Sequence, residues 1–163
     1  MPDRRAALDK AFKALSGHAR GPRGEFVVMG RTVVVPQACN GVARFTFDEL
    51  CGQPLGAADY VELAREFHTI VLDDVPTMGI ERRNEARRFI WLIDALYDMH
   101  VKLVASAAAE PGTLYQATDG GEVFEFQRTE SRLIEMRSTD YLALPHGSGT
   151  SAASGDTSGL VET

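Results

Sequence analysis

The sequence predicts an α/β fold, in which a β-hairpin and a further strand come before a βαβ unit with parallel strands, and helices flank them. The first observation is an apolar run of mostly branched residues at 69–72 that ends in two carboxylates, Asp73 and Asp74. The second is a wide apolar stripe at helical spacing over 81–99, with charged residues opposite it. The third is another apolar run at 101–105. Strand, helix and strand in immediate succession favour parallel pairing with a right-handed crossover.

The N-terminal segment predicts the hairpin, the third strand and the first helices. Two β-prone runs meet at Gly30-Arg31, where a leading glycine favours a type II′ turn. Alternating apolar residues over 41–47 predict a half-buried strand. Asp48 is the expected N-cap of a short helix that ends at Gly52. The other elements expected here are a helix over 5–15, hairpin strands at 25–29 and 32–35, and a helix through 60–67.

Past the βαβ unit, the sequence predicts a brief helical turn at 113–115 and a final helix over 124–138. From Pro145 onward the residues are small and polar with almost nothing to bury, which is typical of a disordered segment. We therefore expect one domain over 1–144 and a disordered tail over 145–163.

Composition limits the class of protein. With 163 residues, 44% of them hydrophobic and 25% charged, the chain suits one globular domain. The formal net charge of -6 argues against a general grip on polyanions, so nucleic acid is not favoured as a partner. Cys39 and Cys51 form no C-x-x-C pattern and the histidines are scattered, so neither a disulfide framework nor a metal site is expected. Without an apolar signal core or a run of about 18 apolar residues, the sequence predicts a cytoplasmic protein with no membrane span.

Polar residues follow both strands of the βαβ unit. Asp73 and Asp74 end the first strand, and Ser106 follows the second. The carboxyl ends of parallel strands share one edge of the sheet, where ligands of open α/β sheets bind. P-loop ATPases hold magnesium with an apolar strand that ends in aspartate, and a polar residue on the neighbouring strand often senses the γ-phosphate. Alternatively, such a carboxylate caps the turn that follows.

Arginines form the second feature that could carry chemistry. Four of them lie in the run ERRNEARR, in the first two turns of the helix expected over 81–99. A guanidinium there could pair with the nearby carboxylates or bind a phosphate through two hydrogen bonds. Arg128 and Arg132 are four residues apart, and therefore neighbours on the last helix. Alternatively, both clusters are solvated surfaces paired with neighbouring glutamates, which are Glu81 and Glu85 for the first and Glu125, Glu130 and Glu135 for the second.

The sequence contains no phosphate-binding P-loop. Such a loop needs G-x-x-x-x-G-K-[ST], because its backbone amides cradle the phosphates and its lysine reaches the outer ones. The three lysines, Lys10, Lys13 and Lys102, each lack the preceding glycine. We therefore expect no self-sufficient P-loop ATPase in these residues.

Four segments carry a family resemblance: GVARFTFDELCGQPLGAADYVELAREFHTIVLDDVP, NEARRFIWLIDALYD, VKLVASA, and FEFQRTESRLIEM with a following YLA. They closely resemble the C-terminal part of the ZapE-type ATPases, and the resemblance covers residues 8–143. These are bacterial cell-division proteins related to the mitochondrial LACE-type, or AFG-like, AAA+ ATPases. The resemblance implies a family that hydrolyses ATP with Mg²⁺, carries its P-loop in an N-terminal half, and in bacteria acts on the division ring built by the tubulin-like protein FtsZ.

The resemblance also points to individual residues. Those that match family motifs are Asp74, Pro76, Asn84, Glu85, Arg87, Arg88, Ser106, Arg128, Ser131, Arg132 and Glu135. Our hypothesis is that Arg87 or Arg88, together with Arg132, approaches nucleotide phosphates or a neighbouring subunit in the full-length enzyme. Asp74 would orient one of those arginines, which makes these four residues the expected supporting catalytic groups. Ser106 and Arg128 are the expected cofactor-binding residues.

Three interpretations remain open. In the first, the chain is the C-terminal domain of such an ATPase, inactive alone, with no ATP or Mg²⁺ expected as its own cofactor and the N-terminal half or other subunits as partners. In the second, it is a non-enzymatic module that binds FtsZ or another subunit. In the third, it is an independent magnesium-dependent phosphohydrolase that uses Asp73 and Asp74.

Overall fold

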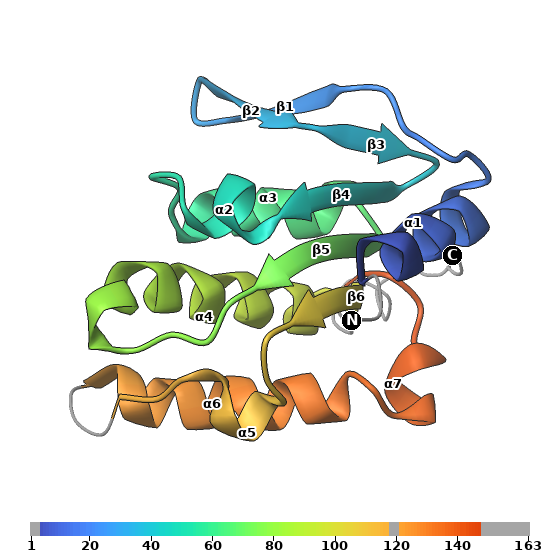
Figure 1. The fold of residues 1–163 in the computed structure, drawn as a ribbon. Helices are drawn as coiled ribbons and strands as arrows, with labels where there is room; N and C mark the ends of the chain where they lie inside the picture. Colours follow the sequence, from blue (N-terminus) through green and yellow to red (C-terminus); the bar gives the residue numbers. More distant parts are fainter. Residues whose placement is uncertain (1–3, 118–120, 148–163) are drawn as a thin grey trace.

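The computed structural model describes residues 4–117 and 121–147, and arranges the strands in two sheets (Figure 1). A two-stranded antiparallel sheet consists of β1 (Gly24–Val28) and β2 (Arg31–Val35). A four-stranded sheet has the order β3-β4-β5-β6. Its members are β3 (Gln37–Cys39), which is antiparallel to its neighbour, and the parallel strands β4 (Val42–Thr46), β5 (Thr69–Val75) and β6 (Lys102–Ala107). The predicted α/β class is confirmed.

The βαβ unit is formed as predicted. β5 leads through a short 3₁₀ turn, η1 (Ile80–Arg82), into α4 (Arg83–Asp98), and the chain returns in β6 parallel to β5. Because β4 also pairs with β5 in parallel, the carboxyl ends of three strands meet at one edge of the sheet. This edge is where the candidate site lies.

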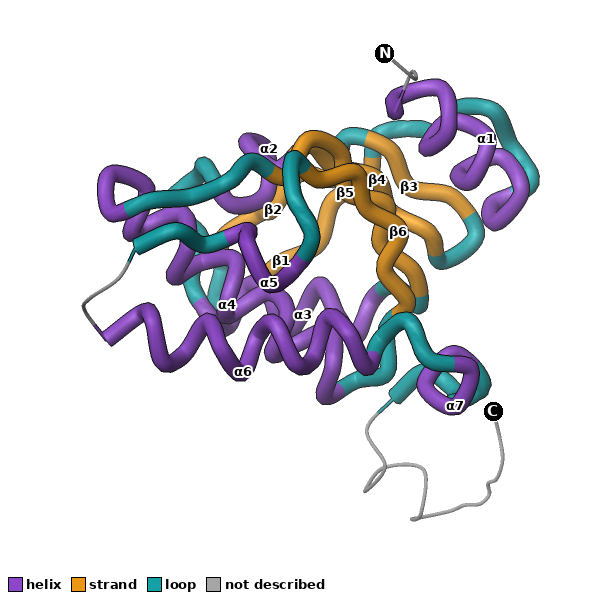
Figure 2. The backbone as a smooth tube through the Cα atoms, turned by 60° about the horizontal axis from the view of Figure 1, so that its bottom comes forward, coloured by secondary structure: helices purple, strands orange, loops and turns teal. Residues whose placement is uncertain are grey.

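Helices cover both faces of the four-stranded sheet (Figure 2). On one face lies α1 (Arg4–Ser16), whose Leu8 and Phe12 pack against Val42 and Val71. The other face packs on α2 (Phe47–Cys51), α3 (Ala57–Glu66) and α4, and the main apolar core lies between them. α6 (Gly121–Glu135) packs on α4 as an outer layer, and α5 (Pro111–Leu114) and α7 (Thr139–Leu142) are single turns. None of the helices in the described ranges combines the length and apolar character needed to cross a bilayer.

The hairpin turn differs from the prediction. Val28 is paired with Arg31, so the two turn residues are Met29 and Gly30 instead of Gly30 and Arg31. Both have positive φ, at 50° and 81°, which a type I′ turn requires and a type II′ turn does not. The type II′ prediction was therefore wrong by one residue, because Met29 was assigned to the strand although it accepts the left-handed conformation.

The sequence reasoning missed β3 altogether. β3 is joined to β4 by a second two-residue turn, Asn40-Gly41, in which both residues have positive φ, at 53° and 80°. An Asn-Gly pair between β-prone residues is a strong hairpin signal. It was overlooked because the expected hairpin ended at residue 35 and the next strand was placed over 41–47.

β4 is more deeply buried than its alternating pattern suggested. Val42, Ala43, Arg44 and Phe45 are all buried, so the strand is not half-buried. The reason is tertiary, since α1 covers the face of β4 that a single-sided sheet would expose to water. Arg44 is therefore a buried charged residue, and its surroundings are central to the site.

The N-cap of α2 is Thr46 and not Asp48. The Thr46 hydroxyl accepts a hydrogen bond from the Glu49 amide at 3.1 Å, and a Glu49 carboxylate oxygen accepts one from the Thr46 amide at 2.8 Å. This reciprocal pair is a capping box. Gly52 ends the helix as expected.

The expected tail begins with residues that have tertiary contacts. The Gly147 amide donates to the Met99 carbonyl at 2.7 Å, and a ring nitrogen of His146 lies 2.6 Å from the Ala64 carbonyl oxygen. The remainder of the predicted disordered tail, 148–163, lies outside the described residues.

Candidate functional site

Asp74 and Ser106 meet at the carboxyl edge of the sheet, as their positions after β5 and β6 predicted. The backbone amide of Asp74 donates to the Ser106 hydroxyl at 2.8 Å. The pairing of β5 with β6 is irregular between Leu72 and Val75, where the ladder changes register. A bulge of this kind redirects the side chain beside it and is common next to functional sites.

Asp74 has an unusual backbone conformation. Its φ is 65°, in the left-handed region that costs free energy for a residue with a side chain, although aspartate tolerates it better than most. Its carboxylate is 64% exposed and lies 3.9 Å from the Arg5 guanidinium on α1. The bulge and the Ser106 hydroxyl therefore present an exposed carboxylate at the edge where ligands of open α/β sheets bind.

Asp73 is placed very differently from Asp74. Both of its oxygens accept hydrogen bonds from Arg44, from Nε at 3.1 Å and from Nη2 at 2.8 Å, and both side chains are buried. Arg44 also donates to Asp9 on α1 at 2.5 Å. Burial alone would lower the pKa of the Arg44 guanidinium, but its hydrogen bonds to Asp73 and Asp9 outweigh burial and raise that pKa. Because Arg44 occupies both oxygens of Asp73, the geometry does not favour magnesium binding by Asp73 and Asp74.

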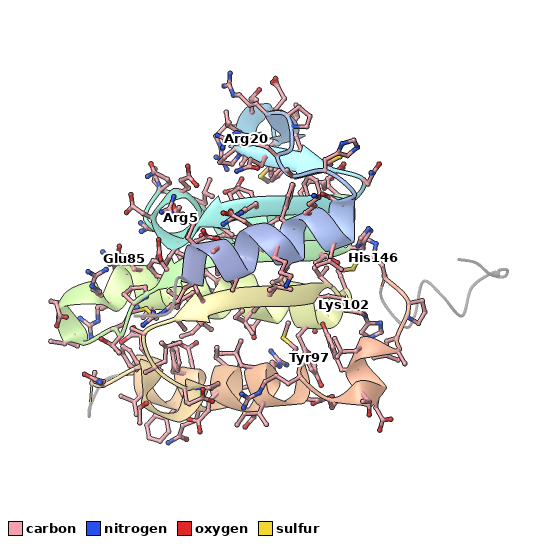
Figure 3. All side chains as sticks on the ribbon, turned by 45° about the vertical axis from the view of Figure 1, so that its right-hand side comes forward. Arg5, Arg20, Glu85, Tyr97, Lys102 and His146 are labelled. Carbon is pink, nitrogen blue, oxygen red and sulfur yellow. The ribbon has the colours of Figure 1, made fainter. Side chains whose placement is uncertain are left out.

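A polar cavity of about 320 Å³ adjoins this network. Figure 3 shows Arg5 near the carboxyl ends of β4 and β5, and Arg20 towards the β1–β2 hairpin. The charged residues that line the cavity are Arg5, Asp9, Arg20, Arg44, Glu49 and Asp73. Sequence reasoning named only Asp73 among them. The available signal was Arg44 itself, an arginine inside the alternating strand that was predicted to be half-buried.

Two of the arginines at the start of α4, Arg83 and Arg87, face α6. Arg87 forms an ion pair with Glu122, and Arg83 Nε lies 3.3 Å from the same carboxylate. The hydrogen bond from Arg87 is the main reason that the pKa of Glu122 is lowered, and a backbone hydrogen bond adds to it. Arg88 donates to the Cys51 carbonyl at 3.2 Å, at the end of α2. Of the partners expected in the first cluster, Glu85 pairs with Arg82 at 3.3 Å, whereas Glu122 was not foreseen.

The second pair of arginines binds α6 to the middle of α4. Arg128 donates to Asp94 at 3.1 Å, and Arg132 forms an ion pair with the other oxygen of the same carboxylate. The Arg132 guanidinium also lies 4.8 Å from the centre of the Tyr97 ring. Sequence reasoning placed the alternative partners on the helix itself, but the two arginines face α4.

The predicted site residues therefore lie in two separate regions. Asp74 and Ser106 are at the carboxyl edge of the sheet, whereas Arg87, Arg128 and Arg132 lie between α4 and α6 and Arg88 contacts α2. The expected pairing of Asp74 with Arg87, Arg88 or Arg132 is not formed in the described part of the chain, where Asp74 faces Arg5. The described His, Cys, Asp and Glu residues form no group of three suited to hold a metal ion.

Fold and site together define an α/β module with a polar cavity at the carboxyl ends of its parallel strands and, in a separate region, a helix pair bridged by arginines. Residues 2–145 match the model of the AFG1-like ATPase family. The chain is 40% identical over 146 residues to cell division protein ZapE of Escherichia coli, a match that covers 89% of this chain and 38% of that protein. It is 33% identical over 174 residues to lactation elevated protein 1 homolog B of Danio rerio, with 86% and 34% covered. An uncharacterised Schizosaccharomyces pombe protein is 39% identical over 147 residues, with 74% and 32% covered.

The chain therefore belongs to the AFG1-like ATPase family. It spans about a third of the length of the curated relatives it matches. The comparison with solved structures gave no significant match.

Proposed function

We propose that residues 2–145 form the C-terminal module of an ATP-hydrolysing enzyme of this family, and that the module does not hydrolyse ATP by itself. The observation that carries this proposal is a match to the family model over nearly the whole domain in a sequence without G-x-x-x-x-G-K-[ST]. Backbone amides and a lysine that bind ATP phosphates would come from another part of the enzyme. ATP and Mg²⁺ are then cofactors of the complete enzyme, and the cytoplasm is its proposed location.

Within this proposal, the arginines act at the boundary between the module and its partner. The Arg87 and Arg128 side chains are 44% and 49% exposed, so each retains surface for a further contact beyond Glu122 or Asp94. A guanidinium shared in this way can bridge to a phosphate or to a carboxylate of a neighbouring subunit. Asp74 and Ser106 present the corresponding polar surface at the carboxyl edge of the sheet.

Two measurements test the proposal. The isolated 163-residue chain, assayed with ATP and Mg²⁺, is expected to release no phosphate above a blank. A chimera in which residues 2–145 replace the matched segment of the Escherichia coli ZapE protein is expected to hydrolyse ATP. Turnover by the isolated chain that survives controls for contaminating enzymes would contradict the proposal, as would a folded but inactive chimera.

The roles of individual arginines need the same chimera. Replacing Arg88 or Arg132 by alanine is expected to lower ATP hydrolysis while circular dichroism shows an unchanged fold. Arg23 lies in an exposed loop far from α4 in sequence, and Arg23→Ala is the control that should leave hydrolysis unchanged. Unchanged hydrolysis in both variants would remove these arginines from the catalytic proposal.

A second candidate function is that of a non-enzymatic interaction module. The observation that favours it is a pair of exposed apolar side chains on α6, Phe124 at 75% and Ile134 at 49% exposed. Since the Escherichia coli relative is named a cell division protein, the partner to test first is FtsZ. Co-sedimentation with FtsZ polymers that is lost in Phe124→Ser, with the fold unchanged, would favour this function, and no co-sedimentation would count against it.

A further inference from the structure

β6 is an edge strand whose outer side has no neighbouring strand among the described residues. A cavity of about 600 Å³ lies beside it, within the range of sites that bind ligands and peptides. Figure 1 shows α6 running opposite β6, with the chain that leads to α5 passing between them. The groove is thus bounded by the strand on one side and by α5 and α6 on the other.

The backbone of β6 has hydrogen-bonding groups that point into this groove. The Lys102 amide donates to the His68 carbonyl and the Ala108 amide donates to the Val75 carbonyl, so these residues face β5. In a parallel ladder, the amides and carbonyls of alternate residues point to opposite sides of the strand. Leu103, Ala105 and Ala107 therefore direct their backbone groups away from β5, and the same three residues line the groove.

The outward groups of β6 are mostly unoccupied within the described residues. The Ala107 carbonyl accepts a hydrogen bond from Arg4 at 3.1 Å, which confirms that it points away from β5. The backbone groups of Leu103 and Ala105 have no such partner among the described residues. An edge strand without a covering element, a proline or a charged residue is a template for another strand. After Lys102, which begins β6, the run from Leu103 to Ala109 contains no proline and no charged residue.

The walls of the groove suit small and apolar side chains. Leu133 and Met136 of α6, Leu114 of α5, and Phe89 form the apolar side. Ala105 pairs with the buried Leu72, on the sheet face that carries the main core, and yet Ala105 is exposed. This position is therefore open to the groove. A strand added here would bury Ala105 and satisfy the backbone of β6 together.

The charges at one end favour an acidic residue in the bound strand. Arg4 stands at the Ala107 carbonyl, and Arg137 lies in the groove wall. The carboxylate that offsets them is Glu110, 3.2 Å from Arg137, and both of these side chains are largely exposed. Together with Arg5 and Asp74 at the same edge, three guanidinium groups stand against two carboxylates, which leaves an excess of positive charge at the carboxyl end of β6.

The groove admits a single extended chain rather than a second copy of the domain. A partner that paired its own β6 with this edge would bring its α5 and α6 against the same elements here, since they stand opposite the strand. A single strand needs only the spacing of about 4.8 Å between neighbouring strands.

We propose that this groove binds an extended segment of the ATPase polypeptide from outside residues 1–163. The segment adds a strand to β6 and places small or apolar side chains against α5 and α6, with an acidic residue near Arg4 and Arg137. The relatives are about three times as long as the matched region, so the complete enzyme would have chain outside it from which such a segment can come. This inference rests on the proposed function, because it requires the module to act as part of a longer enzyme.

Residue-resolved hydrogen exchange tests the inference, with the isolated chain compared with the chimera that carries residues 2–145 in the Escherichia coli ZapE protein. We expect the Leu103 and Ala105 amides to exchange at least about tenfold more slowly in the chimera. The Val104 amide faces β5, and so it serves as an internal control with unchanged exchange.

The outcomes separate this inference from the proposed function. A chimera that hydrolyses ATP while Leu103 and Ala105 exchange as in the isolated chain would overturn the groove proposal and leave the function intact. Protection without hydrolysis would support the groove and contradict the function. Protection that is already present in the isolated chain and is lost on deleting 148–163, or that depends on protein concentration, would also overturn the proposal, because the occupant would be the chain's own tail or a second copy.

A matched pair of variants provides a second test in the chimera. Ala105→Glu fills the groove beside β6, and we expect it to remove the protection of the Leu103 amide. Ala14→Glu places the same side chain at an exposed position on α1 and should leave that protection unchanged. Equal protection in both variants would contradict the strand-addition proposal.

Discussion

Two charged regions of the molecule differ in how deeply their ion pairs are buried. At the sheet, Arg44 and Asp73 form an ion pair whose side chains are only 8% and 5% exposed, and Asp9 extends the network to α1. Between α4 and α6, half-exposed arginines share Asp94 and Glu122. Removing one partner of a buried ion pair strongly destabilises the fold, whereas an ion pair at the surface contributes little to stability. The comparison indicates that the first network holds the fold, while the arginines of the second keep about half of their side-chain surface exposed.

The largest loss of stability is expected when the buried network of Arg44, Asp73 and Asp9 is broken. Arg44→Ala leaves the Asp73 carboxylate buried without its partner, which should lower the free energy of unfolding by about 3–5 kcal/mol. Urea denaturation followed by circular dichroism measures it. The control is Arg44→Met combined with Asp73→Leu, which removes both charges and should recover much of the loss. A cost below about 1 kcal/mol for Arg44→Ala would mean that water reaches Asp73.

A smaller, pH-dependent effect is expected at Glu122. Its pKa is lowered in the folded protein by the hydrogen bond from Arg87, so its ionised form stabilises the fold. This contribution is complete above the unfolded pKa of glutamate, about 4.3, and is lost as the pH falls through the lower folded value. Glu122→Gln should therefore unfold more easily at neutral pH, and its difference from the wild type should shrink in acid. Denaturation midpoints over a pH series measure this, and a pH-independent difference would contradict it.

Replacing Ser106 should lower the stability by a still smaller amount. Ser106→Ala removes the hydroxyl that accepts from the Asp74 amide, which should lower the free energy of unfolding by about 1 kcal/mol. Asp74→Gly tests the backbone conformation of Asp74 at the same site, since glycine adopts a positive φ without strain. If Asp74→Gly is as stable as the wild type and yet slows ATP hydrolysis in the chimera, the strained aspartate serves function more than folding.

The smallest effect is expected at Arg132. Arg132→Lys keeps the positive charge but loses the planar contact with Tyr97 and the fixed geometry towards Asp94. The partly exposed pair should therefore change the free energy of unfolding by less than about 1 kcal/mol. Thermal denaturation at low and high salt measures it. A loss as large as that of Arg44→Ala would show that the two regions do not differ as described.

Local sequence patterns predicted most helices and strands, because such patterns are formed by residues close together along the chain. The apolar run before Asp73 and the stripe of the following helix gave the βαβ unit, and parallel pairing then brought Asp74 and Ser106 together. Asn40-Gly41 carried a hairpin signal that was available and was missed. The partners of the arginines were not available in this way, since Glu122 and Asp94 lie more than 30 residues from the arginines they bind.

The sequence by itself determined the α/β class, the βαβ unit, the absence of a phosphate cradle within these 163 residues and the family resemblance, because each depends on residue types at short, fixed spacings. Only the tertiary structure decided that α1 covers β4 and buries Arg44 with Asp73, and that α6 takes the arginines of α4. It alone shows that the outer side of β6 has no neighbouring strand in the described part of the chain. These features arise from packing between elements distant along the chain, where burial and pairing depend on which surfaces meet.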